Sequence, residues 1–106
     1  MTVPGMNPHL SIPKAELASF CRMHDIRWLA LFGSALRADF GPHSDVDVLV
    51  EFVEGRTPGL LGIAGLEIEL SALFGGRKID LRTPQDLSRY LRQDVLDKAV
   101  VQYARR

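Results

Sequence analysis

The chain has little cysteine, and this scarcity excludes two kinds of site. Cys21 is the only cysteine among 106 residues. One thiol cannot form an internal disulfide, and it cannot build a zinc site from several cysteines. A lone thiol also fits a reducing compartment, so we expect a cytoplasmic protein.

Long apolar runs and an excess of one charge are also missing. No run approaches the ~20 apolar residues that cross a bilayer, and residues 1–5 lack the basic and apolar regions of a signal peptide. Thirteen basic residues balance thirteen acidic ones, so the chain lacks the basic excess that nonspecific nucleic-acid binding requires. We therefore expect no membrane span and no direct nucleic-acid binding.

The composition that remains is that of an ordinary globular domain. Hydrophobic residues make up 46% of the chain and charged residues 25%. The length predicts a single domain, residues 1–106, with a modest core. Residues 1–10 contain two prolines and a glycine, which is typical of a flexible N-terminal arm.

Apolar periodicity predicts helices that alternate with short strands. The expected elements are a helix from a Ser11 cap to about His24 with Pro13 in its first turn, strands over 28–32, 45–53 and 78–82, a helix that Gly75-Gly76 ends, and a helical tail from Thr83-Pro84 with Leu91, Val95, Leu96 and Ala99 inside. This order predicts an α/β (α+β) fold, in which helices flank a small mixed sheet of three or four strands.

One stretch does not fit ordinary core, surface or turn. Gly33 and Ser34 end an apolar strand, and Asp45 and Asp47 open the next one. The loop offers backbone N–H groups and a hydroxyl to a phosphate, and Gly33 permits a close approach. Strand side chains alternate, so the two carboxylates share a face, where they are hard oxygen ligands for magnesium.

A third carboxylate would complete a site for two magnesium ions. Asp80 lies between two apolar residues in the last expected strand, and it shares the face of Asp45 and Asp47 if that strand pairs with theirs. Two bridged metal ions can activate an attacking oxygen and stabilise a departing one at phosphorus. Arg37, placed to share a helical side with Ser34, can add a charge-assisted phosphate contact.

Plain structural roles stay open for the same residues. Asp45 and Asp47 can cap a turn and face solvent, and Arg37 can pair with Asp39. Asp80 can form a surface salt bridge with a neighbouring basic residue, Arg77 or Lys78. The spacing alone does not decide between these roles and a metal–phosphate site.

Together the motifs resemble the DNA polymerase β-like nucleotidyltransferases. More narrowly, the chain is similar to the minimal nucleotidyltransferases, the antitoxin half of HEPN–MNT toxin–antitoxin pairs. The resemblance covers nearly the whole chain and depends on Phe32-Gly33-Ser34, Arg37, Ser44-Asp45-Val46-Asp47, Leu73-Phe74-Gly75 and Ile79-Asp80-Leu81. It implies a palm-like fold and transfer of AMP from ATP, with release of pyrophosphate.

The resemblance also implies roles for residues and a partner. Asp45 and Asp47 would bind both magnesium ions, and Asp80 would hold one of them and help activate the attacking hydroxyl. The nucleotide would be bound by Gly33, Ser34, Arg37 and Ser44. By the resemblance alone, the acceptor would be a tyrosine of a HEPN ribonuclease toxin. The short chain agrees with this, because its acceptor surface would have to come largely from a substrate that docks.

Two other functions remain open at this point. The protein can neutralise a toxin by stoichiometric binding, with a weak or inactive site. It can also transfer a nucleotide to a small molecule or to an RNA end.

Overall fold

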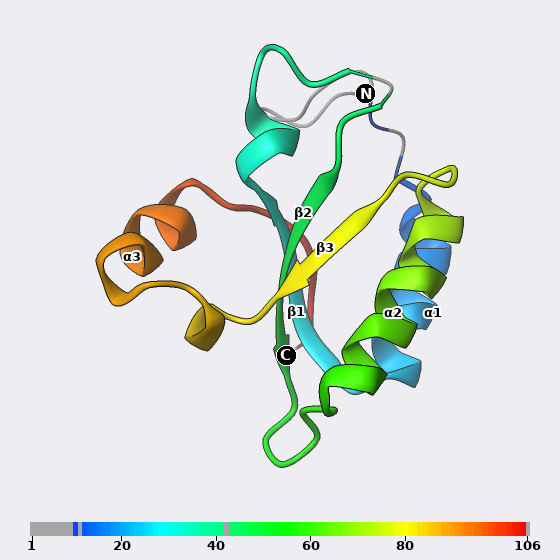
Figure 1. Cartoon of the computed structure of the whole chain (residues 1–106). Helices are drawn as coiled ribbons and strands as arrows, with labels where there is room; N and C mark the ends of the chain where they lie inside the picture. The colour runs from blue at the N-terminus through cyan, green and yellow to red at the C-terminus, as the bar shows by residue number, and fades with distance from the viewer. Residues whose placement is uncertain (1–9, 11, 42, 106) are drawn as a thin grey trace.

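The computed structural model describes residues 10, 12–41 and 43–105, and places a sheet between two layers of helices (Figure 1). In chain order the elements are α1 (Lys14–Met23), β1 (Ile26–Phe32), the 3-10 helix η1 (Gly33–Leu36), β2 (Val46–Phe52), α2 (Leu60–Leu73), β3 (Ile79–Arg82), the 3-10 helix η2 (Pro84–Asp86), α3 (Arg89–Lys98) and β4 (Val100–Ala104). None of the described helices is long and apolar enough to cross a membrane.

The strands of the described chain form one mixed sheet in the order β3-β2-β1-β4. β1 is antiparallel to both β2 and β4, whereas β2 and β3 are parallel. A parallel pair needs a crossover connection, and α2 provides it. The expected α+β fold is therefore confirmed, in its four-stranded form.

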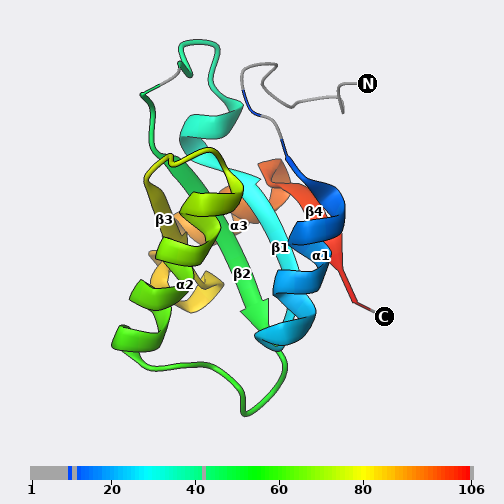
Figure 2. The same cartoon turned by 90° about the vertical axis from the view of Figure 1, so that its right-hand side faces the viewer.

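One face of the sheet carries the main hydrophobic core. Val46, Val48 and Val50 of β2 are fully buried there. Figure 2 shows α1 and α2 side by side over this face, with α3 behind the sheet. Burial raises the pKa of the Cys21 thiol, which lies in this core, to about 12, so the thiol stays protonated.

Helix α2 gives a direct test of this core. Leu70 is fully buried and Leu61 of the same helix is 91% exposed. We expect Leu70→Ala to lower the free energy of unfolding by about 2–5 kcal/mol, because it leaves a cavity under the helix. The same substitution at Leu61 should change it by less than about 0.5 kcal/mol. Urea denaturation followed by circular dichroism measures both, and equal losses would contradict the placement of α2.

The first helix differs from the expectation at its start. α1 begins at Lys14, and Pro13 takes the cap position instead of lying in the first turn. Ser11, the expected cap, and residues 1–9 of the expected arm lie outside the described residues. Leu10 is buried in the core, so the end of the expected arm packs against the domain.

The expected C-terminal helix is divided into three elements. The Asp86 carboxylate accepts hydrogen bonds from the N–H and hydroxyl of Thr83, both at 3.0 Å, and this closes η2 as a separate turn. A new helix, α3, starts after Ser88, whose hydroxyl accepts from the N–H of Tyr90. Leu91 was expected inside but is exposed. The chain then pairs with the free edge of β1 as β4, which satisfies backbone groups that a helix would leave open there.

Candidate functional site

The end of β1 brings a carboxylate against the backbone. Gly33 has φ +58°, and a Cβ atom at this position would lie 2.6 Å from Oδ2 of Asp47. The N–H of Ser34 donates a 3.0 Å hydrogen bond to the same Oδ2. The close approach of Asp47 therefore requires glycine, whereas Gly33 was expected from the sequence to make room for a phosphate.

The hydroxyl of Ser34 connects the loop to the backbone of Asp45. Oγ of Ser34 donates to the backbone carbonyl of Asp45 at 2.6 Å. The side chain of Asp45 is exposed, whereas Asp47 is half-buried at the start of β2. Ser34 thus contacts both residues of the aspartate pair. In this structure the N–H and the hydroxyl that were expected to bind phosphate both have protein acceptors.

The carboxylate of Asp80 lies beside that of Asp47. Asp47 and Asp80 are register partners on the parallel strands β2 and β3, so their side chains emerge from the same face as neighbours. This is the pairing on which the three-carboxylate expectation depended. Asp80 also forms a salt bridge with Arg82, a partner that was not among those expected from the sequence.

The donor chemistry of this group fits a magnesium–nucleotide complex. Magnesium is usually held by one or two carboxylates together with substrate phosphates. Within the described residues no three acidic, histidine or cysteine side chains gather as a ready-made metal site. The contacts explain this, because Asp47 is turned to the N–H of Ser34 and Asp80 to Arg82. Binding metal would need these carboxylates to turn from protein donors to the ion.

Arg37 and Ser44, which were also expected to bind the nucleotide, form contacts within the loop before β2. Arg37 forms a two-point ion pair with Asp39, with N–O distances of 3.0 and 2.9 Å, which is the alternative that the sequence left open. Oγ of Ser44 accepts from the N–H of Gly41 at 2.9 Å.

Sequence reasoning missed Arg77, which secures this loop. Its guanidinium lies 4.6 Å from the centre of the Phe40 ring, and Nη1 donates to the carbonyls of Gly41 and Ser44 at 2.8 and 3.2 Å. Arg77 is half-buried in this position. The parallel register brings the residues before β3 next to those before β2, and this neighbourhood has no local signal in the sequence.

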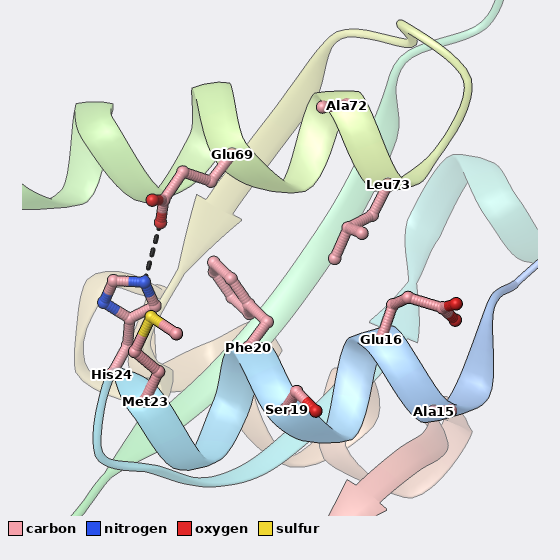
Figure 3. A pocket seen from close by; sticks show the side chains of 9 residues that line it. All are labelled: Ala15, Glu16, Ser19, Phe20, Met23, His24, Glu69, Ala72 and Leu73. Carbon is pink, nitrogen blue, oxygen red and sulfur yellow. Dashed lines mark ion pairs between the residues drawn. The ribbon is translucent and has the colours of Figure 1, made fainter.

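The apolar pocket between α1 and α2 is a separate feature. It has a volume of about 560 Å³, and Nε2 of His24 lies 2.7 Å from Oε2 of Glu69 at its edge (Figure 3). α1 and α2 cover the face of the sheet that buries Val46. Asp47 points to the opposite face, because strand side chains alternate. This pocket therefore lies away from the carboxylates.

Two relatives share the sequence over most of its length. The chain is 39% identical over 100 residues to the protein adenylyltransferase MntA of Thermococcus cleftensis, covering 94% of this chain and 95% of that one. It is 31% identical over 87 residues to a provisionally named protein adenylyltransferase of Methanocaldococcus jannaschii, covering 82% of this chain and 90% of the relative.

Solved structures share the fold. A provisionally named minimal nucleotidyltransferase is 36% identical, with a TM-score of 0.65 over 82% of this chain and 86% of that one. A toxin–antitoxin crystal structure with AMP-PNP is 19% identical, with a TM-score of 0.70 over 88% of this chain and 74% of that one, and shows likeness of fold alone. The model of the nucleotidyltransferase domain family matches residues 16–102. The chain therefore belongs to the nucleotidyltransferase domain family.

Proposed function

We propose that this nucleotidyltransferase is the antitoxin of a toxin–antitoxin pair, and that it transfers AMP from ATP to a tyrosine of a HEPN ribonuclease toxin in a magnesium-dependent reaction. The observation that carries the proposal is the contact of Asp47 with the Gly33-Ser34 loop, beside Asp80 on the next strand. It joins phosphate-binding groups to hard oxygen ligands at one end of the sheet.

The proposed roles of the residues are consistent with their positions. Asp45, Asp47 and Asp80 would hold the magnesium ions. Bound magnesium supplies a positive charge that stabilises the attacking and leaving oxygens at phosphorus. Ser34 would turn its N–H and hydroxyl from the aspartates to the triphosphate and orient it. Asp80, at the edge of the group, would help to take the proton of the attacking hydroxyl.

The comparisons support a protein as the acceptor. Both relatives carry the name of a protein adenylyltransferase, and one structure of the same fold comes from a toxin–antitoxin complex. The tyrosine and the HEPN ribonuclease come from the resemblance in the sequence. Transfer would silence the toxin by modifying it and would release pyrophosphate.

Label transfer tests the proposal directly. The purified protein is incubated with α-labelled ATP, magnesium and the HEPN toxin proposed as its partner. We expect label on a tyrosine of the toxin, and no label after the divalent ions are removed with EDTA, because the carboxylates then have no metal to hold. Tyrosine is identified by mass spectrometry of the labelled peptide. Absence of transfer to the authentic partner would rule the proposal out.

Neutralisation by binding alone is the competing function, and one observation favours it. The carboxylates of the described residues do not gather as a metal site in the free chain. Protection of cells from the toxin separates the two functions. Full protection by the Asp45→Asn/Asp47→Asn double variant would indicate binding, whereas loss of protection by a folded double variant would indicate chemistry. Transfer to RNA or a small molecule without a partner would indicate a different acceptor.

A further inference from the structure

The contact between Asp80 and Arg82 puts a positive charge on a carboxylate of the proposed metal site. Both residues lie on β3 and, two positions apart, share one face of the sheet. Nε and Nη2 of Arg82 each lie 3.3 Å from Oδ2 of Asp80. The guanidinium thus lies beside an oxygen that a metal ion would need.

The geometry of this pair makes it easy to displace. Both contacts use the same oxygen of Asp80, at long hydrogen-bond distances, and the side chains are 47% and 40% exposed. Arg37 and Asp39, by contrast, pair through two oxygens at 3.0 and 2.9 Å. Two-point pairs with short distances are the strong ones. Arg82 therefore holds Asp80 weakly enough for a divalent ion to compete.

Charge balance explains why a cation is placed there. Asp47 and Asp80 are neighbours across the parallel pair of strands, where two negative charges repel each other. Arg82 offsets part of this repulsion when no metal is bound. A divalent ion at the same carboxylate would be repelled by the guanidinium, since like charges a few ångströms apart interact strongly outside bulk water.

We propose that Arg82 is a positioning residue that gates the metal site: it holds the Asp80 carboxylate in the metal-free protein and is displaced when a divalent cation binds. The inference rests on the proposed function, because it takes Asp80 as a metal ligand. Arg82 keeps the site folded and charge-compensated without metal. In exchange it weakens the affinity of the free protein for the ion, so that metal enters mainly together with a triphosphate.

Binding of Mn²⁺ alone, without nucleotide, tests the gate. Free Mn²⁺ is followed by electron paramagnetic resonance during titration of the protein. Arg82→Gln should lower the Kd for Mn²⁺ on the order of tenfold, because it removes the positive charge that competes with the ion for the Asp80 carboxylate. Arg82→Lys keeps that charge and should bind Mn²⁺ much as the original protein does. If Arg82→Gln does not fold, Arg82→Met, which keeps the apolar stem, replaces it.

A matched control and a double variant make the test specific. Arg27 pairs with Glu51, with 56% and 41% of the two side chains exposed, so Arg27→Gln removes an equally exposed cation from the sheet and should leave the Kd unchanged. In the Asp80→Asn background, Arg82→Gln should bring no gain, since its effect passes through Asp80.

The outcomes separate the gate from the proposed function. Unchanged or weaker Mn²⁺ binding by Arg82→Gln would overturn the gate, and so would an equal gain in Arg82→Lys. Label transfer is measured independently. If the protein transfers AMP but Arg82→Gln does not change Mn²⁺ binding, the proposed function stands and the gate is wrong. If Arg82→Gln strengthens Mn²⁺ binding but no transfer is found, the gate stands and the proposed reaction is wrong.

Discussion

Asp47→Asn is expected to lower the rate of AMP transfer on the order of 10³-fold, because in the proposed reaction a neutral amide would replace a charged metal ligand worth several kcal/mol in the transition state. The fold should survive. Asparagine has the same shape, and its Oδ1 can still accept the hydrogen bond that the N–H of Ser34 now donates to Oδ2 of Asp47 at 3.0 Å. Label transfer from α-labelled ATP to the toxin measures the rate, and thermal unfolding checks the fold.

Asp94→Asn is the matched control for this substitution. Asp94 is exposed on α3 and pairs with Lys98 at 3.1 Å, on an element that does not carry the carboxylate group. The control removes one negative charge in the same way, so its rate of transfer should not change. A folded Asp47→Asn protein that transfers AMP as fast as this control would show that Asp47 is not a metal ligand in the reaction.

Gly33→Ala is expected to reduce transfer on the order of 10²-fold, although it adds only one methyl group. That methyl would lie 2.6 Å from Oδ2 of Asp47, so the carboxylate or the loop must move, and displacements of about 1 Å at a reacting centre cost rates of this size. The residue would also keep a left-handed backbone, φ +58°, at a cost of about 1–2 kcal/mol in the free energy of unfolding.

Gly55→Ala separates these two effects. Gly55 has φ +78°, and no atom of the described residues lies within 4 Å of the Cβ position. The Gly55→Ala protein should lose about 1–2 kcal/mol of the free energy of unfolding, as Gly33→Ala does. Its rate of transfer should not change. Urea denaturation and label transfer measure the two quantities. If both variants lost activity equally, backbone strain or general destabilisation would explain the loss, and the contact with Asp47 would not.

Much of the fold and of the site was predictable because its signals are local. The apolar run that Gly33 interrupts predicts a strand followed by a turn, and the structure has β1 and η1 there. The alternation around Asp47 predicts a half-buried strand with its carboxylate away from the core, as observed in β2. Spacings of this kind depend only on local backbone geometry, which is the same wherever the segment packs.

Contacts between distant residues were not predictable in the same way. Arg77 is half-buried and holds the loop before β2 through the carbonyl of Gly41, whereas Arg82 pairs with Asp80 on its own strand. The contacts of Arg77 depend on the register of β3 against β2 and on the position of Phe40. The division of the C-terminal helix likewise depends on β1, whose free edge accepts β4.

The sequence by itself determined the candidate residues: a glycine and a serine after an apolar strand, two aspartates on one face of the next strand, and a lone acid in a later strand. Their chemistry and spacing are properties of the local chain. Only the tertiary structure decided that Asp80 stands beside Asp47 and that Arg82 occupies its carboxylate. The first depends on the parallel register of β2 and β3, which is set by burying Val46, Val48, Ile79 and Leu81 against the same core. The second depends on the side-chain conformations that Asp80 and Arg82 take on β3.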